Sequence, residues 1–215
     1  SKLHLLLLLA AVNMDEQALT HLKALLESMV YYSTVNQIKT NELERLYAQW
    51  CKQIREIHTD EELTSFINNK IKPTISQWKV NNRSNFMRIG FDSMQQYRVK
   101  FILARITKYV DVRRKNGGDA SNVAEFYEGG IEIEHTMPQK YSAAYGISED
   151  DYNAAKQRLG NLTLLEKTIN ASIGDDAFAS KSEAYRQSAY YLTRSIAQLD
   201  DVGQQTAINR MNQKL

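Results

Sequence analysis

The first half of the chain repeats apolar residues at helical spacing. One such pattern runs from Asp15 to Tyr32, and a second from Asn41 to Ile57. The stretch Thr59 to Glu62 reads as a capping box, which predicts a third helix continuing through Ile71. Residues 3–12 are nearly all apolar and are predicted to form a buried helix, because they are too few to span a bilayer. The pattern therefore predicts a series of packed helices.

The helical pattern continues after two breaks. Pro73 indicates a break or a fresh helix start. The polar residues 81–85 predict a loop. The stretch Ser93 to Gln96 reads as a second capping box, which opens a long helix to about Arg113. The apolar positions of this helix are expected to face the core: Val99, Ile102, Leu103, Ile106 and Val110.

The second half follows a different pattern. Residues 131–134 alternate apolar and acidic side chains, as a half-buried strand does, and Pro138 prevents that strand from continuing. Residues 159–165 predict a second short strand, opened by a Gly-Asn turn. Helices are expected to begin at Ser148 and near Thr168, and two further helices are expected over 180–199 and 204–215. The residues of the 180–199 helix that are expected to face inward are Tyr185, Ala189, Leu192 and Ile196. The predicted fold class is mainly α, with a helical region over 1–120 and a strand–loop–strand–helix region over 121–215.

Charge separates the same two regions. Residues 1–120 hold 18 lysines and arginines against 12 acids, whereas residues 121–215 hold 9 against 13. Between Lys70 and Lys115 there are 12 basic residues and only two acids, Asp92 and Asp111. Arg98 and Arg105 are seven positions apart and share one helix face. Such a segment suits contact with nucleic-acid phosphates, although a solvated helix face gives the same pattern.

Cysteine usage narrows the chemistry. Cys51 is the single cysteine of the chain. A disulfide framework and a cysteine-rich zinc site are therefore excluded, and a reducing cytoplasm fits. Cys51 follows Trp50 within a helical pattern, which favours a buried, inert thiol.

Glu134 and His135 stand together at the end of the first predicted strand. A carboxylate can bind a hard divalent cation, and an imidazole can take a proton from water near neutral pH. This pairing suits metal-assisted hydrolysis, but Glu-His pairs are common, and taken by itself a surface strand end is the favoured explanation. Asn161 and Asn170 have similarly simple alternatives, as a turn residue and a helix cap.

The ordered set of motifs resembles a known family. From Ile131 to Ser188 the chain is similar to the HNH-like nuclease domain that ends GmrSD-type modification-dependent restriction enzymes. The nine-residue step between Asn161 and Asn170 is also similar to that of the HNH domain of RNA-guided DNA nucleases. The residues that carry the resemblance are Glu134, His135, Pro138, Gln139, Gly160, Asn161, Leu162, Thr163, Leu164, Asn170, Phe178, Lys181, Tyr185 and Ser188.

The resemblance implies a ββα-metal unit and assigns roles within it. His135 becomes the general base, Glu134 and Asn170 the ligands of Mg²⁺ or Mn²⁺, and Asn161 the residue that orients the histidine. Lys181 becomes a phosphate contact, although it could equally be a surface lysine with its stem laid on apolar neighbours. Thr136 stands where relatives carry an aliphatic residue, a departure expected to affect strand packing without touching the site.

The resemblance also implies a biological setting. We expect a cytoplasmic, metal-dependent DNA endonuclease module of a bacterial phage-defence protein, with Arg98, Arg105 and Lys181 contacting DNA. A nucleotide-using domain is expected N-terminal to this region, outside the present sequence. Two alternatives stay open: an RNase on the same fold, and a non-catalytic nucleic-acid-binding or regulatory domain.

Overall fold

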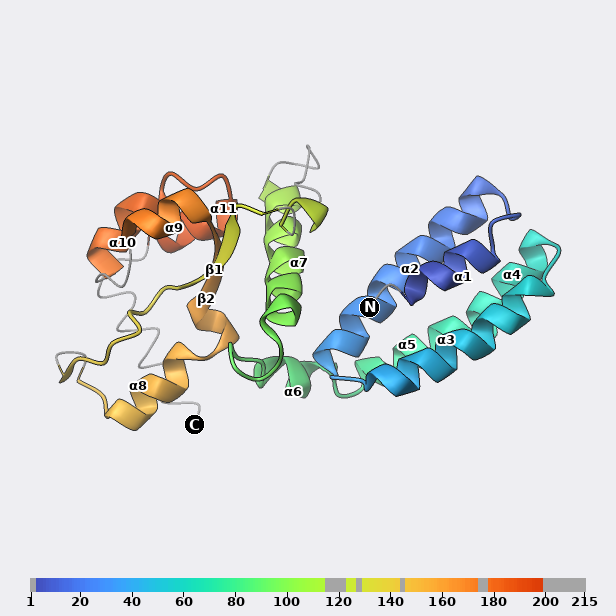
Figure 1. Cartoon of the computed structure of the whole chain (residues 1–215), viewed down its shortest axis with the longest axis horizontal. Helices are drawn as coiled ribbons and strands as arrows, with labels where there is room; N and C mark the ends of the chain where they lie inside the picture. The colour runs from blue at the N-terminus through green and yellow to red at the C-terminus, as the bar shows by residue number, and fades with distance from the viewer. Residues whose placement is uncertain (1–2, 115–122, 127–128, 144–145, 174–177, 199–215) are drawn as a thin grey trace. The chain divides into compact units, whose positions relative to one another are not determined.

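The computed structural model describes residues 3–114, 123–126, 129–143, 146–173 and 178–198 (Figure 1). The fold is mainly helical, with a small two-stranded antiparallel sheet. The chain divides into two compact units, Ser1–Met87 and Arg88–Leu215. No helix in the described ranges is long and apolar enough to cross a membrane.

The N-terminal unit is built of helices whose buried apolar side chains form one cluster, which includes Leu22, Trp50 and Ile67. The Asp15 side chain accepts a hydrogen bond from the amide of Ala18, and the predicted capping box of Thr59 and Glu62 is formed. The elements are α1 (His4–Ala10), α2 (Glu16–Val35), α3 (Thr40–Arg55), α4 (Asp60–Phe66), the π-turn η1 (Ile67–Ile71), α5 (Lys72–Lys79, with Pro73 in its first turn) and α6 (Asn82–Met87).

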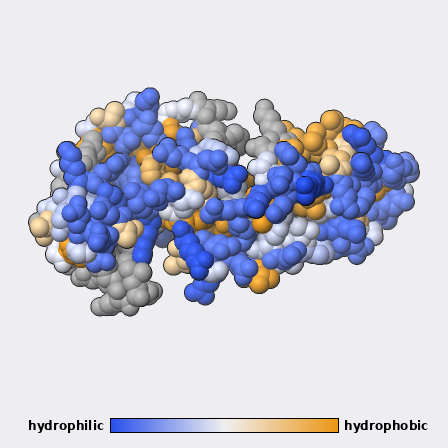
Figure 2. Space-filling model, turned by 60° about the horizontal axis from the view of Figure 1, so that its bottom comes forward, coloured by the Kyte–Doolittle hydropathy of each residue, from blue (hydrophilic) through white to orange (hydrophobic). Residues whose placement is uncertain are grey.

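Two predictions for this unit are corrected. Residues 82–87 form a helix where a loop over 81–85 was expected, and Asn85 donates a hydrogen bond from its side chain to that of Asn36, the C-cap residue of α2. That tertiary contact offsets the weak helix propensity of asparagine. The apolar segment 3–12 forms α1 as predicted, but its Leu9 is 66% exposed and only Leu7 of the helix is buried. Figure 2 shows hydrophobic residues gathered on the surface of this unit.

The long helix α7 (Gln96–Arg114) opens the C-terminal unit. Val99, Ile102 and Leu103 are buried as predicted, whereas Ile106 and Val110 are only half-buried. The prediction of a capping box from Ser93 to Gln96 is wrong. The Ser93 hydroxyl instead accepts a hydrogen bond from the amide of Gly90 and donates one to its carbonyl, so it closes a turn before the helix.

The hairpin follows the prediction closely. β1 (Ile131–His135) pairs with β2 (Leu162–Glu166) in antiparallel register, with Ile131 opposite Glu166 and His135 opposite Leu162. β2 is buried over most of its length because α7, α9 and α11 pack against it. The remaining elements are η2 (Val123–Phe126), α8 (Glu149–Lys156), η4 (Leu159–Asn161), α9 (Lys167–Ile173), α10 (Phe178–Tyr185) and α11 (Tyr191–Ile196).

The C-terminal helices differ from their prediction. The single helix expected over 180–199 is two helices, separated at Ser188, whose carbonyl accepts a hydrogen bond from Arg194. Tyr185 is buried as expected, but Ala189 is exposed because it lies in that interruption. The helix expected from Ser148 is α8, and the Ser148 side chain caps it by accepting a hydrogen bond from the Asp151 amide. The helix predicted over 204–215 lies outside the described residues.

Along the chain, the first compact unit ends at Met87, whereas the sequence pattern and charge divided the chain at residue 120. The reason is that α7 packs on β2 and α11, so the basic helix and the hairpin share one unit.

Candidate active site

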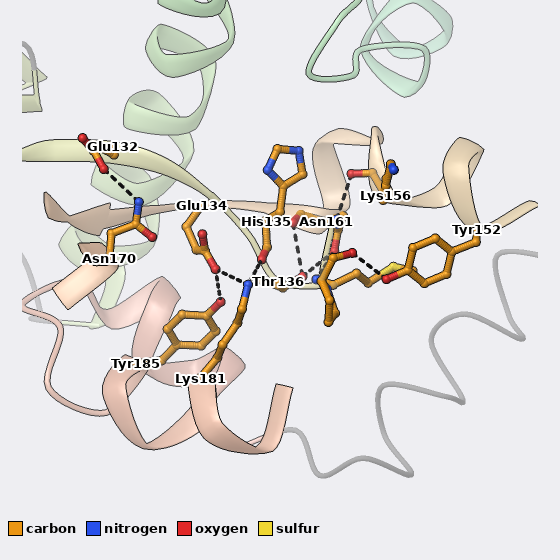
Figure 3. Close-up of polar contacts among 12 residues, drawn as sticks. Glu132, Glu134, His135, Thr136, Tyr152, Lys156, Asn161, Asn170, Lys181 and Tyr185 are labelled. Atoms are coloured by element: carbon orange, nitrogen blue, oxygen red, sulfur yellow. Dashed lines mark hydrogen bonds and ion pairs between the residues drawn. The ribbon is translucent and has the colours of Figure 1, made fainter. Parts of the chain in front are cut away.

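The end of β1 presents two functional side chains to opposite sides. Successive residues of a strand alternate between its faces. Accordingly, the Glu134 carboxylate points toward α10, while the His135 imidazole projects the other way (Figure 3). Both residues are buried, at 7% and 5% exposure. Adjacency in sequence therefore does not bring the carboxylate and the imidazole together.

Glu134 is held by two side chains of α10. Its Oε1 atom accepts hydrogen bonds from Lys181 Nζ at 2.7 Å and from the Tyr185 hydroxyl at 2.9 Å. Lys181 and Tyr185 are 1% and 0% exposed, so this is a buried ion pair with a third member. Burial and the adjacent charge of Glu134 raise the pKa of Tyr185 far above its usual range, which keeps the phenol a hydrogen-bond donor.

Lys181 also fixes the neighbouring residue. Its Nζ atom donates a second hydrogen bond, of 2.9 Å, to the main-chain carbonyl of His135. On the other side the His135 ring stacks edge to face with Phe91, with ring centroids 4.6 Å apart. One ammonium group thus holds both Glu134 and the backbone that carries the imidazole.

Asn161 clamps the chain immediately after His135. Its Oδ1 atom accepts hydrogen bonds from the Thr136 hydroxyl at 2.6 Å and the Met137 amide at 2.8 Å, and its Nδ2 atom donates to the Lys156 carbonyl. Both acceptor positions of the amide oxygen are therefore used. Asn161 acts on the backbone that follows the histidine, and these bonds leave the imidazole itself untouched.

Thr136 requires a correction. It was expected to affect strand packing without touching the site, but its hydroxyl donates to the Asn161 side chain and its amide donates to the Asn161 carbonyl. The aliphatic residue expected at this position has no hydroxyl for the first of these bonds. Thr136 is therefore part of the clamp.

Asn170 pairs with a residue that the sequence did not single out. Its Nδ2 atom donates a 2.8 Å hydrogen bond to Oε2 of Glu132 on β1. Glu132 and Glu134 are two positions apart and share a strand face, so α9 and α10 each contact one of them (Figure 3). Asn170 is the fourth residue of α9, within the helix, and its side chain is not a cap.

The donors on this strand face fit a hard cation in kind. Carboxylate and amide oxygens are the ligands that Mg²⁺ prefers. Among the described residues, Glu134 Oε2 and Asn170 Oδ1 have no hydrogen-bond partner, so each group keeps one oxygen for a metal. The Lys181 ammonium opposes a cation here, and no three His, Cys, Asp or Glu side chains of the described ranges form a metal-binding group.

The other predicted contact residues lie elsewhere. Arg98 and Arg105 are half-buried on α7, whereas Lys181 lies inside the unit instead of on its surface. Sequence reasoning missed Glu132 and Phe91. The alternation along β1 marks Glu132 as a neighbour of Glu134, but no local signal places Phe91 against His135, because 44 positions separate them.

Comparison with known proteins agrees with the motifs. The family model described as "GmrSD restriction endonucleases, C-terminal domain" matches residues 77–213, well over half of the chain. This range includes α7 and extends beyond the 131–188 stretch that carries the motif resemblance. No curated protein matches the chain. The chain belongs to the family of the C-terminal domains of GmrSD restriction endonucleases.

Proposed function

We propose that this chain is a metal-dependent DNA endonuclease module in which His135 is the general base. The observation that supports this most is the way in which His135 is held at the end of β1. There the imidazole is held from one side by Phe91, while Lys181 and the Asn161 clamp fix the main chain on either side of it. A base that must meet a water and a phosphorus needs this kind of positioning.

His135 would accept the proton of the attacking water through a ring nitrogen. Proton transfer by a positioned side chain typically contributes on the order of 10²–10⁴ in rate. His135 is the only histidine after residue 58, so no other imidazole of the C-terminal unit can take its place. The roles of Asn161 and Lys181 are to hold the backbone on which the imidazole stands.

Glu134 Oε2 and Asn170 Oδ1 are the groups that would hold Mg²⁺ or Mn²⁺. Bound there, the cation would supply charge stabilisation at the phosphate and at the leaving oxygen. Tyr185 and Lys181 fix the opposite oxygen of Glu134, so the carboxylate is oriented before a cation arrives. The burial of Lys181 favours this positioning role over the predicted phosphate contact.

The setting of this activity is part of the proposal. Family membership favours DNA as the substrate, and we propose cytoplasmic restriction of phage DNA as the role. A nucleotide-using domain N-terminal to this region would control the module. An RNase on the same fold is the second candidate, because none of the site contacts would read the sugar.

His135→Ala and Asn161→Ala test the proposal together in a plasmid-nicking assay. His135→Ala should lower nicking by roughly 10²–10⁴, while the chain, with some loss of stability from the missing Phe91 contact, still unfolds cooperatively. Asn161→Ala should lower both activity and stability, because it releases Thr136, Met137 and the Lys156 carbonyl. Unchanged nicking by His135→Ala would refute the assignment of the base.

A further inference from the structure

One side of α7 carries two exposed tyrosines and four basic residues, of which Arg98, Arg105 and Lys108 are half-buried. With 3.6 residues per turn, six side chains fall on one side of the helix, and we call them the α7 stripe. They are Tyr97, Arg98, Arg105, Lys108, Tyr109 and Arg113. From Tyr97 to Arg113 the stripe extends for about 24 Å along the helix. The only acid of α7 is Asp111, which is buried and accepts a hydrogen bond from the Tyr191 amide.

The two tyrosines of the α7 stripe are largely exposed to solvent. Tyr97 and Tyr109 are 55% and 57% exposed, among the most exposed large apolar side chains of the described residues. Each stands beside an arginine of the same helix. The Arg98 guanidinium lies 5.9 Å from the Tyr97 ring centroid, and that of Arg113 lies 4.7 Å from the Tyr109 centroid. Burial in this unit therefore does not explain either tyrosine.

We propose that the α7 stripe binds an unpaired DNA strand. Positive side chains attract the phosphates, and exposed aromatic rings stack on bases whose faces are free. In a duplex the base faces are stacked on one another, so a duplex would use the cations of the stripe and leave Tyr97 and Tyr109 without a role. This inference rests on the proposed function, because it names the form of DNA that the nuclease module grips.

The stripe and the hairpin belong to one compact unit, which makes the inference relevant to cleavage. Lys100 of α7 donates a 2.6 Å hydrogen bond to the Ile131 carbonyl at the start of β1. The helix that would hold the DNA, α7, is therefore hydrogen-bonded to β1, the β-strand that carries His135.

Binding is measured on the full chain in EDTA, so that cleavage plays no part. Fluorescence anisotropy compares a labelled single-stranded oligonucleotide with a duplex of the same sequence. The double variant Tyr97→Ala/Tyr109→Ala should weaken single-strand binding by roughly fivefold or more and leave duplex binding nearly unchanged. Tyr97→Phe/Tyr109→Phe should retain single-strand binding, because the ring remains. Arg113→Gln should weaken both forms, and Lys52→Gln, at an exposed lysine of α3, should weaken neither.

Three results would overturn the inference. They are an alanine double variant that binds the single strand as tightly as the unchanged chain, an equal loss on the duplex, and a phenylalanine double variant as weak as the alanine one. Any of these can occur while metal-dependent nicking persists, so the proposed function would survive. Tighter binding to RNA of the same sequence would contradict the choice of DNA.

Discussion

At the scale of single residues, the buried ion pair at Glu134 decides how the site is held. Lys181 and Glu134 are both almost inaccessible, and their charges are 2.7 Å apart. A pair of this kind adds little net stability over an apolar pair, but removing one partner leaves a buried charge alone. We therefore expect the pair to act by favouring one arrangement of β1 and α10 over its alternatives.

Lys181→Met should lower the free energy of unfolding by roughly 3–5 kcal/mol, because the Glu134 carboxylate loses its counter-charge. Adding Glu134→Leu to that variant should restore part of the loss. Urea unfolding of the single and double variants gives the coupling energy. A loss below about 1 kcal/mol for Lys181→Met would match an exposed pair and contradict the positioning role.

Asn170→Asp tests the proposed cation site. The new carboxylate would lose the hydrogen bond to Glu132 and lie beside its negative charge, so the metal-free protein should melt at a lower temperature. Manganese should then raise the melting temperature more than it does in the unchanged chain, because a charged oxygen binds a hard cation better than an amide.

Glu132→Gln is the matched control, since it removes the partner charge and keeps a hydrogen-bonding side chain. His135→Ala should leave manganese binding unchanged in a calorimetric titration, whereas Glu134→Gln should weaken it strongly. If His135→Ala loses manganese and the Asn170 variants do not, then the histidine is the ligand and the assigned roles are reversed.

At the scale of elements, backbone hydrogen bonds join residues 89–91, which precede α7, to residues 157–159, which precede β2. We call these two paired segments the strap. Gly90 bridges to Arg158, the Phe91 amide donates to the Gln157 carbonyl, and the Leu159 amide donates to the Ile89 carbonyl. A Cβ atom on Gly90 would lie 2.6 Å from that Gln157 carbonyl oxygen. The strap therefore requires glycine, and it places Phe91 against His135.

Gly90→Ala should lower stability by roughly 1–3 kcal/mol, because backbone atoms must shift to admit the methyl group. It should also lower nicking, because Phe91 moves with the strap. Gly160→Ala is the control, since a Cβ there meets nothing within 4 Å. The measurement is a comparison of the thermal melts and nicking rates of the two variants. Equal melting temperatures and equal nicking rates would show that the strap does not position the histidine.

Sequence patterns predicted the elements of this fold better than its contacts. The periodicity of α2, α3 and α7 and the alternation of β1 are local properties, and each is present where predicted. The helix at 82–87 is joined to the rest of its unit by the hydrogen bond from Asn85 to Asn36, and the interruption at Ser188 precedes the packing of α11 against β2, so both involve tertiary contacts that no local pattern indicates. For the same reason the motifs indicated His135, Glu134, Asn161 and Asn170, whereas Phe91 and the pairing of Asn170 with Glu132 required the folded chain.

At the scale of the whole molecule, the basic helix belongs with the hairpin. Divided at Met87, the first unit holds 10 basic and 9 acidic residues, and the second holds 17 and 16. The second unit therefore combines cations on α7 with the acidic surroundings of β1. A nuclease needs both, because phosphates must be held close to where a cation would bind.

DNA affinity should consequently fall steeply with salt. Each phosphate neutralised on duplex DNA contributes about −0.9 to the slope of log affinity against log salt concentration. Arg98→Gln and Arg105→Gln should each weaken binding and flatten that slope, as measured by filter binding over a salt series. A slope unchanged by both substitutions would mean that α7 presents only a solvated face.

The most direct measurement is nicking of supercoiled plasmid by the full chain and by His135→Ala, each with magnesium and with EDTA, beside a structured RNA. We expect nicked plasmid only for the unchanged chain with magnesium, and intact RNA throughout. Plasmid left intact by the unchanged chain in magnesium and in manganese, or cut equally by His135→Ala, would contradict it.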